Sequence, residues 1–267
     1  MSTKNLDYPN LSQLLEHHLD IQTGIYLLPP MPLGQGLCMS RSPLISDMEW
    51  NFAWGNLPVE QSLRDEALGT ILHTTESYGL KPVYYSTVEP EKLHLPYHES
   101  VRETWMILPQ DSLVKRAVPE GLTVTVLDKS EEDMFLSIYE EAFSSPESIQ
   151  NDKPDLDSAY LFCLKTSFSS GAGAGCNWIG KMNGEPVCIA TLLVHGEMAG
   201  LYNVGTRLKD QGRGYGWQIT QHVIQNALSL GIRWIYLQTE QGSTVEKFYS
   251  RMGFVSHSSG YYLKLRK

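Results

Sequence analysis

The segment at residues 209–216, KDQGRGYG, places three glycines within five positions and leads directly into the helical pattern WQITQHVIQNALSLG. Glycine adopts positive φ angles without steric cost, so such a cluster marks a sharp turn or a backbone that a ligand approaches closely. At the start of a helix the first N–H groups have no intrahelical partner and the helix dipole is positive, which favours an anion such as phosphate. The segment therefore predicts either a phosphate-binding turn or a glycine-rich connection without a ligand. No Gly-Lys-Ser/Thr follows, which excludes a Walker loop.

The residues that flank this loop carry the periodicities of a chain that alternates strands and helices. Period-two alternation predicts strands at 122–128, 198–206, 232–240 and 254–267, and a hairpin over 177–196 that turns at Asn183-Gly184. Helical spacing predicts three helices, at 131–143, 217–230 and 244–252. The order β-α-β-β-β-α-β-α-β predicts an α/β (α+β mixed sheet) fold with strands of mixed direction.

Capping signals mark the ends of the three predicted helices. Ser130 is the expected N-cap of the first helix, with Asp133 three positions further on. The second helix ends at Gly231, and Ser243 with Glu246 forms a capping box for the third. The expected apolar faces of the second and third helices comprise Ile219, Val223, Ala227 and Leu230, and Val245, Phe248, Tyr249 and Met252, respectively.

Two further stretches bear on the domain organisation. The segment LPQDSLVKRAVPEGLTV contains two prolines, a glycine and mixed charges between apolar strings, which predicts a domain boundary near 110–120. We therefore expect two domains, at 1–112 and 120–267. The stretch SSGAGAGCNW (169–178) has the spacing G-x-G-x-G and not that of a dinucleotide fingerprint, so it predicts a loop that feeds a strand.

Composition and charge exclude several classes of protein. The chain is 42% hydrophobic and 19% charged, as in a globular protein, and no apolar run reaches the roughly 18 residues of a membrane span. A net charge of −9 argues against nucleic-acid binding, and the tyrosine pairs 84–85 and 261–262 are expected to pack within strands. The N-terminus lacks a signal-peptide pattern and the four cysteines lack metal-ligand spacing, so we expect a cytoplasmic protein with reduced thiols. His17 and His18 lie on an expected surface helix without acidic or cysteine partners, so no metal site is predicted.

At its glycine loop the chain resembles the GNAT superfamily of N-acetyltransferases. The signature of that family, Gln/Arg-x-x-Gly-x-Gly/Ala at a strand-to-helix junction, is met by Gln211, Gly214 and Gly216. The resemblance extends through the following helix, Gly231, strand, capped helix and FYSRMGF, and covers about residues 120–267. It implies the GNAT acyltransferase fold and acetyl-coenzyme A as cosubstrate, with the pyrophosphate held by Gln211, Gly212, Arg213, Gly214, Tyr215, Gly216 and Trp217.

The same resemblance assigns the remainder of the site. The strand before the loop pairs with the pantetheine arm in that family, which corresponds here to Val204, Gly205 and Thr206. Backbone amides there would polarise the thioester carbonyl. Tyr249 matches the general acid of the family, and a phenol with a reference pKa of about 10 stays protonated at neutral pH and can donate to a departing thiolate. The alternative for Tyr249 is a packing role on its helix beside Phe248.

Two positions depart from the family pattern, one at a coenzyme contact and one at a catalytic base. Gly242 stands where many members carry an Asn that contacts the coenzyme, seven positions before the Tyr. Leu237 stands where some members carry a Glu base, and Glu240 lies nearby without the spacing of a base. An ammonium substrate must lose a proton before it attacks, so the sequence requires a base or a water chain and names neither.

The N-terminal part of the chain carries signs of a second copy of the same fold. The string ESYGLKPVYYST (76–87) resembles LSLGIRWIYLQT (228–239) at an offset of 152 residues, and at the same offset Tyr97 falls on Tyr249. The counterpart of the glycine loop, VEQSLR (59–64), contains no glycine. We expect a tandem protein with a degenerate N-terminal copy that shapes the substrate pocket or the subunit packing and does not bind coenzyme; the alternative is an unrelated α/β domain.

The sequence thus predicts an N-acetyltransferase that moves an acetyl group from acetyl-CoA to a primary amine. A non-catalytic acyl-CoA binding or sensing module is the alternative, supported by the two departures and opposed by Tyr249. Antibiotic, polyamine, amino acid and protein N-terminus all fit as acceptors, and the acidic net charge favours a small amine. We expect no metal, no nucleic acid and no membrane among the partners, and the sequence is compatible with a homodimer.

Overall fold

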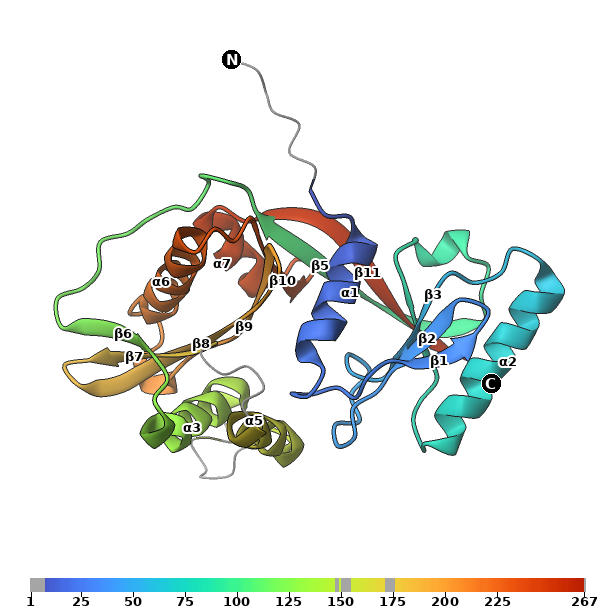
Figure 1. Cartoon of the computed structure of the whole chain (residues 1–267), viewed down its shortest axis with the longest axis horizontal. Helices are drawn as coiled ribbons and strands as arrows, with labels where there is room; N and C mark the ends of the chain where they lie inside the picture. Colours follow the sequence, from blue (N-terminus) through green and yellow to red (C-terminus); the bar gives the residue numbers. More distant parts are fainter. Residues whose placement is uncertain (1–7, 147–148, 150–154, 171–175, 267) are drawn as a thin grey trace, which may run out of the picture.

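The computed structural model describes residues 8–146, 149, 155–170 and 176–266, and its strands form one mixed sheet (Figure 1). The sheet has 11 strands in the order β1-β2-β3-β4-β11-β5-β10-β9-β8-β7-β6. Their bounds are β1 Met31–Gly34, β2 Leu37–Ser40, β3 Phe52–Gly55, β4 Val83–Ser86, β5 Tyr97–Leu108, β6 Leu122–Val126, β7 Asn177–Met182, β8 Glu185–His195, β9 Met198–Thr206, β10 Trp234–Glu240 and β11 Val255–Leu265. The α/β fold with mixed strand directions is therefore confirmed.

Helices cover both faces of the C-terminal part of this sheet. The six helices of the described residues are α1 Leu11–Gln22, α2 Gln61–Ser77, α3 Glu132–Phe143, α5 Ser158–Ser170, α6 Tyr215–Ser229 and α7 Thr244–Met252. In Figure 1, α6 and α7 lie on one face of β7–β10, α3 and α5 lie on the other, and α1 stands between the two halves of the molecule. The segment between β5 and β6 passes around the outside of α6, where Gln218 and Gln221 hydrogen-bond its backbone at Ala117 and Arg116.

The two halves of the chain repeat one arrangement of strands. In the N-terminal half β1, β2 and β3 are successively antiparallel, and β3 runs parallel to β4 with α2 as the crossover. In the C-terminal half β7, β8 and β9 are successively antiparallel, and β9 runs parallel to β10 with α6 as the crossover. The tandem arrangement with an N-terminal copy is thus confirmed at the level of the fold.

The last strand of each half lies in the sheet of the other half. β5 closes the N-terminal half in sequence, yet it pairs along its length with β10, from Leu108 opposite Ile235 to Glu103 opposite Glu240. β11 closes the C-terminal half and pairs with β4, and β5 and β11 pair with each other at the centre of the sheet. This exchange brings side chains of the N-terminal half to the edge of the C-terminal site. The predicted domain limits, 1–112 and 120–267, stay a prediction, and β5 lies before the expected boundary.

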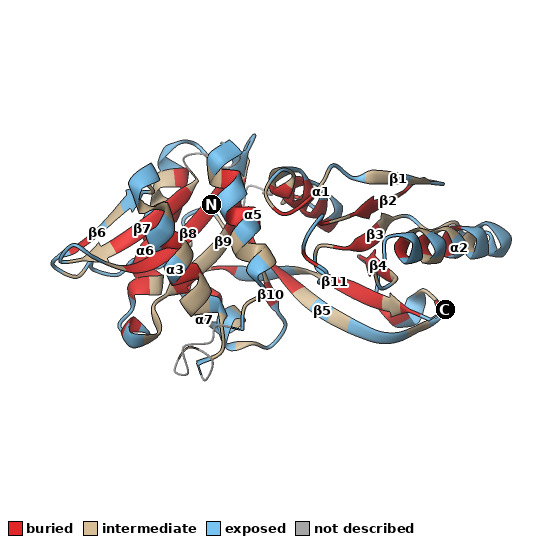
Figure 2. Ribbon diagram, turned by 90° about the horizontal axis from the view of Figure 1, so that it is seen from below, coloured by how far each residue is buried: buried red, intermediate tan, exposed pale blue. Residues whose placement is uncertain are grey.

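The core follows the central strands on both faces (Figure 2). One apolar cluster packs α6 and α7 against the sheet, and a second, which includes Trp105 and Tyr236, lies beneath α1. Tyr85 and Tyr262 are 2% and 4% exposed and belong to the second cluster, which confirms that the tyrosine pairs pack within strands.

Most of the local predictions agree with these elements. The hairpin turns at Asn183 and Gly184, which have φ angles of 51° and 89° as a type I′ turn requires. Gly253 ends α7 with a φ of 107°, and a Cβ there would meet the Ser112 carbonyl oxygen at 2.0 Å. Residues 171–175 of the predicted glycine-rich loop lie outside the described residues.

Five local expectations were wrong or incomplete. Asp128 rather than Ser130 caps the turn before α3, because its carboxylate accepts the Ser130 N–H and Glu131 reaches back to the Asp128 N–H. Leu230 is 74% exposed, since it is the C-cap of α6 and points past the end of the packed face. Val245 is 51% exposed, and α5 was not anticipated. The Tyr97–Tyr249 correspondence fails because Tyr97 begins β5, whereas Tyr249 lies within α7.

Candidate functional site

The two parallel strands of the C-terminal half separate at the point where the site was predicted. β9 and β10 pair only from Met198–Gly200 to Trp234–Tyr236, although both strands continue, to Thr206 and Glu240. The other edge of β9 stays paired with β8 through Gly205 and Thr206. Within the described part of the chain, the backbone of 204–206 on the β10 side therefore has no strand partner. An extended ligand can add to such an edge by main-chain hydrogen bonds.

A β-bulge produces this separation. Between the paired positions Tyr202 and Gly205, β9 spans three steps while β8 spans two, from Thr191 to Ile189. Asn203 lies in the extra step with a φ of 51°, and its side-chain amide donates to the Thr191 hydroxyl at 3.1 Å. A bulge bends the strand that carries it and re-aims the neighbouring groups, and such features are frequent beside functional sites.

The glycine loop is open to solvent at the N-terminus of α6. Gly212 and Gly214 have φ angles of 77° and 85°, and a Cβ at either position would meet no atom within 4 Å. These glycines are therefore required for backbone conformation, and the space above them is free. Gly214 is the N-cap of α6, and no side chain of the described residues caps this helix end. The first-turn N–H groups are thus available to an anion.

The other predicted loop residues divide between solvent and core. Gln211 donates to the Thr206 carbonyl at 3.3 Å, and the exposed Arg213 lies 3.5 Å from Asp210 and is free to turn outward. Tyr215 and Trp217 are 7% and 3% exposed and pack in the core beneath α6, so they would reach a ligand through their backbone.

Gly205 serves close packing instead of ligand approach. A Cβ on Gly205 would lie 2.8 Å from the Ala142 side chain, so this glycine lets α3 approach β9. A Cβ on Gly216 would lie 3.4 Å from the Thr206 hydroxyl oxygen, which is an ordinary van der Waals contact, so packing does not require glycine there. The structure thus brings Val204, Gly205 and Thr206 together with the glycine loop.

Tyr249 lies in α7 on the face that packs against the sheet. It is 7% exposed, with its ring against Phe248 and Phe254 at centroid distances of 5.0 and 5.6 Å. Its hydroxyl makes no hydrogen bond to the described residues, and burial raises the pKa of Tyr249 well above its usual range. The phenol is therefore protonated at any physiological pH.

A pocket opens on the α1 side of the sheet where β9 and β10 separate. It has a volume of about 290 Å³ and is lined by residues of both halves: His18, Glu49, Trp50, Val101, Arg102, Glu103, Tyr202, Gln238, Thr239, Glu240 and Tyr262. Tyr202 and Gln238 stand two residues beyond the last pair that joins β9 and β10. The pocket therefore begins where the open backbone edge begins, and we call it the interhalf pocket.

Glu103 is the most perturbed acid of the interhalf pocket. Its Oε1 atom accepts hydrogen bonds from the Tyr85 hydroxyl at 2.6 Å and from Trp105 Nε1 at 2.7 Å. Burial raises the pKa of Glu103 to about 7, even though these two donors lower it. Gly260 stands opposite Glu103 on β11, and a Cβ there would lie 1.7 Å from the Tyr85 hydroxyl oxygen. The glycine thus leaves the space that Tyr85 needs to hold the carboxylate.

His17 and His18 are buried in α1, which corrects the expectation of a surface helix. They are 8% and 5% exposed, because α1 packs its histidine face onto the sheet between the halves. His18 Nδ1 contacts the Tyr202 hydroxyl and His17 Nδ1 contacts the Tyr236 hydroxyl, both at 2.8 Å, and the two hydroxyls are 3.3 Å apart. Burial lowers the pKa of His18 to about 3, so its imidazole is neutral.

The sequence could not identify Glu103 as a site residue. Leu237, at the position of the base in the family, is 2% exposed and belongs to the core beneath α6 and α7. The acids near the end of β10 are instead Glu240, which lines the interhalf pocket, and Glu103, which pairs opposite it. Because Glu103 lies more than 130 residues before Glu240 in the chain, only the exchanged strand β5 brings them together. An acidic residue flanked by Trp105 was the only local signal.

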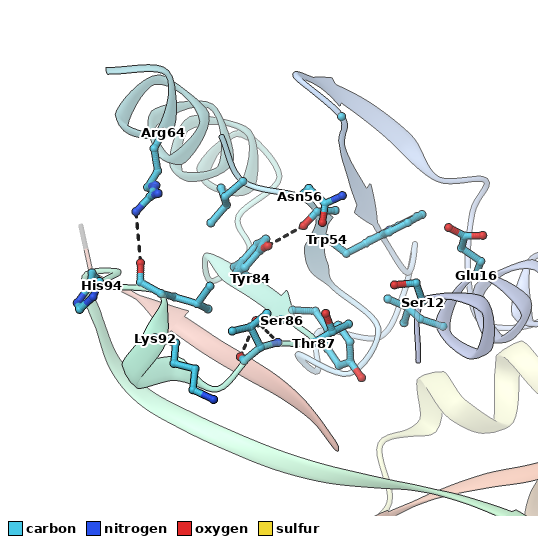
Figure 3. A pocket seen from close by; sticks show the side chains of 17 residues that line it. Ser12, Glu16, Trp54, Asn56, Arg64, Tyr84, Ser86, Thr87, Lys92 and His94 are labelled. Carbon is cyan, nitrogen blue, oxygen red and sulfur yellow. Dashed lines mark hydrogen bonds between the residues drawn. The ribbon is translucent and has the colours of Figure 1, made fainter. Parts of the chain in front are cut away.

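The N-terminal half has its own cleft at the corresponding place, between the ends of β3 and β4. It has a volume of about 500 Å³ and includes Trp54, Arg64 and Tyr84 (Figure 3). The Arg64 guanidinium bonds the carbonyl oxygens of Pro58 and Leu93 at 3.0 and 3.4 Å, and the Tyr84 hydroxyl bonds that of Gly55. Glu60 is the N-cap of α2 and residues 56–64 contain no glycine, so the helix end carries an acid where the C-terminal half has an open turn.

The described residues contain neither a metal-ligand cluster nor a membrane-spanning helix. No group of three or more His, Cys, Asp or Glu side chains in that part of the chain is arranged to hold a metal ion. None of its helices combines the length and the apolar character needed to cross a bilayer.

Comparison with known proteins agrees with this geometry. Residues 178–263 match the family model described as FR47-like protein. No curated protein matches the chain in sequence. A solved structure of a GCN5-related N-acetyltransferase from Kribbella flavida is 15% identical, with 95% of each chain covered and a TM-score of 0.65.

Two further structures resemble nearly the whole chain. A GCN5-related N-acetyltransferase from Sphaerobacter thermophilus is 17% identical, with 93% of this chain and 84% of that chain covered and a TM-score of 0.61. A functionally unknown conserved protein from Staphylococcus epidermidis is 12% identical, with 88% and 92% covered and a TM-score of 0.64. The chain therefore has the GNAT fold over both halves, and the resemblance of its C-terminal region to the GNAT superfamily is confirmed.

Proposed function

We propose that this protein is an N-acetyltransferase that transfers an acetyl group from acetyl-CoA to a primary amine of a small acceptor. The observation that carries this proposal is the open backbone edge of 204–206, which leads directly into an α6 N-terminus that no side chain of the described residues caps. An extended arm with a phosphate group at its end matches both features, because the edge offers main-chain hydrogen bonds and the helix N-terminus favours an anion.

The proposed roles follow from these positions. The N–H groups of Gln211–Trp217 would bind the pyrophosphate, and Arg213 would add a charge-assisted contact. The amides of 204–206 would pair with the pantetheine arm and stabilise the oxyanion that forms on the thioester carbonyl. Tyr249, protonated at neutral pH, would give its proton to the thiolate that leaves.

A non-catalytic module that binds or senses acyl-CoA is the alternative. It is supported by Gly242, which has no side chain for the coenzyme, and by Leu237, which cannot act as a base. The enzyme is favoured by the interhalf pocket, since a sensor needs no second cavity at the point where the thioester would end. Both functions require coenzyme binding, and only the enzyme requires Tyr249.

The first experiment is a calorimetric titration of the native chain with acetyl-CoA, beside the Gly214→Glu and Gly231→Glu variants. Both glycines have positive φ angles, 85° and 84°, and open space around the Cβ position, and they lie at opposite ends of α6. Binding that is lost only in Gly214→Glu supports the phosphate site. Absence of acetyl-CoA binding to the native chain would refute the proposed function. Equal loss of binding in both variants would mean that backbone strain, and not loss of a phosphate site, weakens binding.

A second step separates enzyme from sensor. Release of free thiol from acetyl-CoA is followed with a panel of primary amines, in the native chain and in Tyr249→Phe. Amine-dependent thiol release that falls in the variant supports the enzyme. Tight coenzyme binding without thiol release for any amine would support the sensing module.

A further inference from the structure

We propose that the interhalf pocket is the acceptor site, that it takes a primary ammonium on a short apolar or aromatic stem, and that Glu103 is the base that deprotonates it. The inference rests on the proposed function, and it assigns both the missing base and the class of acceptor. It also gives the N-terminal half a direct part in the reaction, because Glu103 belongs to the exchanged strand β5.

The position of the interhalf pocket makes it the route to the thioester. The arm of the coenzyme would follow 204–206, and the pocket is lined by Tyr202 on β9 and by residues 238–240 on β10, so it opens beside that backbone edge. Gln238 and Glu240 alternate with Leu237 and Thr239 along β10, so the first two side chains face the pocket on the α1 side, whereas Leu237 and Thr239 face α6 and α7.

The lining of the interhalf pocket selects a small cation. Glu49, Glu103 and Glu240 contribute three carboxyl groups, while Arg102 is bonded to the Ser259 hydroxyl at 2.9 Å and lies near the Tyr261 ring. The rings of Trp50, Tyr202 and Tyr262 provide faces for a cation and an apolar stem. The volume of about 290 Å³ is at the lower end of the roughly 300–1,000 Å³ of ligand pockets, which favours a small acceptor.

Glu103 is better suited to accept the proton than the other groups of the pocket. Tyr85 and Trp105 donate to its Oε1 atom and the Tyr262 hydroxyl also hydrogen-bonds the carboxylate; a carboxylate has about four lone-pair sites, so one is left for the ammonium. Glu240 is exposed to solvent, whereas Glu103 is partly buried and held in place. The groups around Glu103 are Tyr85 on β4, Tyr262 on β11, Glu240 on β10, Tyr202 on β9, His18 on α1, Arg102 on β5 and Glu49 before β3.

The histidine–tyrosine chain beneath α1 does not serve as the proton path. His17 Nε2 donates to the His195 carbonyl oxygen at 3.0 Å, so Nδ1 accepts from Tyr236 and the chain ends at a backbone carbonyl. A carbonyl oxygen cannot take the proton onward. His18 would be protonated only in strong acid, because burial lowers its pKa to about 3. A base works best with a pKa near the operating pH, which Glu103 meets with a pKa raised by burial to about 7.

The reaction balances with these two groups. The ammonium gives one proton to Glu103, and the freed electron pair of the nitrogen attacks the thioester carbon to form the C–N bond. The C–S bond then breaks, its electron pair leaves with sulfur, and the thiolate takes a proton from Tyr249. The proton left on the amide nitrogen restores Tyr249, and Glu103 releases its proton to solvent. The products are the N-acetyl amine, coenzyme A and one proton.

The kinetic test compares Glu103→Gln with Glu99→Gln and the native chain. Glu99 lies on the same strand, outside the interhalf pocket, in an exposed pair with Lys264, so it controls for the loss of one carboxylate from β5. With phenethylamine as acceptor we expect Glu103→Gln to lower kcat/KM at pH 7 by about 100-fold or more, with acetyl-CoA binding unchanged. Its rate should rise about tenfold per pH unit as free amine replaces ammonium. A native pH profile in Glu103→Gln would overturn the assignment and leave the proposed function intact.

A titration without catalysis tests Glu103 independently of acetyl transfer. Trp105 donates to Glu103, so ionisation of the carboxyl should change the fluorescence of this indole. We expect a transition near pH 7 in the native chain and in Glu99→Gln, and its loss in Glu103→Gln. His222 packs against Trp178 and titrates in all three proteins, so it cancels in the difference. The same transition in Glu103→Gln would overturn the assignment.

Direct binding of acceptor probes tests the class of ligand. Phenethylamine should bind the native chain and weaken at least tenfold in Glu103→Gln. Phenylethanol lacks the charge and phenylalanine adds a carboxylate that would face the three acids, so both should bind at least tenfold more weakly. Equal binding of the three probes would refute a cation site. If the chain binds phenethylamine selectively but does not bind acetyl-CoA, the interhalf pocket is a cation site and the proposed acetyltransferase function is wrong.

Discussion

Removal of one oxygen atom, in Tyr249→Phe, separates the catalytic role of this tyrosine from a packing role. The ring is 7% exposed between Phe248 and Phe254, and the substitution leaves these contacts in place. The hydroxyl has no hydrogen bond to the described residues, so its loss leaves no other group unsatisfied. A buried polar group without a partner itself costs about 1–3 kcal/mol of stability. We therefore expect the free energy of unfolding to be unchanged or raised by up to about 1 kcal/mol.

The expected effect on turnover is much larger than the effect on stability. A positioned general acid contributes about 10²–10⁴-fold, which at 1.36 kcal/mol for each factor of ten corresponds to about 2.7–5.4 kcal/mol of transition-state stabilisation. Thiol release with saturating amine gives kcat, calorimetry gives the affinity for acetyl-CoA, and urea unfolding gives stability. The affinity should not change, because the proposed phosphate and pantetheine contacts all lie outside α7.

Tyr84→Phe is the matched control, with the opposite pattern. Its hydroxyl donates to the Gly55 carbonyl at 2.6 Å in the N-terminal half, so the same deletion should cost about 0.5–1.5 kcal/mol of stability and leave kcat unchanged. Native turnover in Tyr249→Phe would refute the general-acid role and leave Tyr249 as a residue of the core.

Three further perturbations follow from the geometry. Gly214→Ala should lower the free energy of unfolding by roughly 1–2 kcal/mol, because the φ of Gly214 is 85° and only glycine accepts that conformation freely. The same variant should bind acetyl-CoA more weakly in calorimetry. Gly253→Ala should destabilise by more than the roughly 1–3 kcal/mol of ordinary overpacking, since the new Cβ would lie 2.0 Å from the Ser112 carbonyl oxygen; a melting temperature within a few degrees of native would contradict this. The pKa of Glu103 is raised from 4.5 to about 7 on folding, so its contribution to stability is present below pH 4.5 and is lost as the pH rises through 7. Urea unfolding from pH 5 to 8 should show this loss in the native chain and a smaller one in Glu103→Gln, and identical slopes would argue against the shift.

The local sequence predicted the elements that short-range interactions determine. Glycines with positive φ could be recognised at the Asn183-Gly184 turn and at the ends of α6 and α7, because few other residues adopt that conformation. Alternating and helical periodicities located the strands and most of the helices of the C-terminal half. The Ser130 cap was wrong because Asp128, two residues earlier, accepts hydrogen bonds from both the N–H and the hydroxyl of Ser130, so Ser130 lies inside a capped turn.

The candidate site was accessible to sequence reasoning only on the coenzyme side. The glycine loop and 204–206 are contiguous with their strand and helix, so one local pattern and a family resemblance were enough to place them. The buried positions of His17 and His18 were missed because an isolated helix pattern does not tell which face meets a sheet made of distant strands.

The sequence by itself predicted the α/β class and the glycine-rich helix start, because periodicity and turns are properties of neighbouring residues, and it offered a degenerate N-terminal copy beside the alternative of an unrelated domain. Only the tertiary structure decided that β5 and β11 exchange places, since pairing between strands more than 125 residues apart depends on the whole sheet and leaves no local pattern. That exchange places Glu103 opposite Glu240 and creates the interhalf pocket from both halves. The proposed acceptor side of the site therefore depends on the strand order of the whole sheet, whereas the proposed coenzyme side depends on a short stretch of chain.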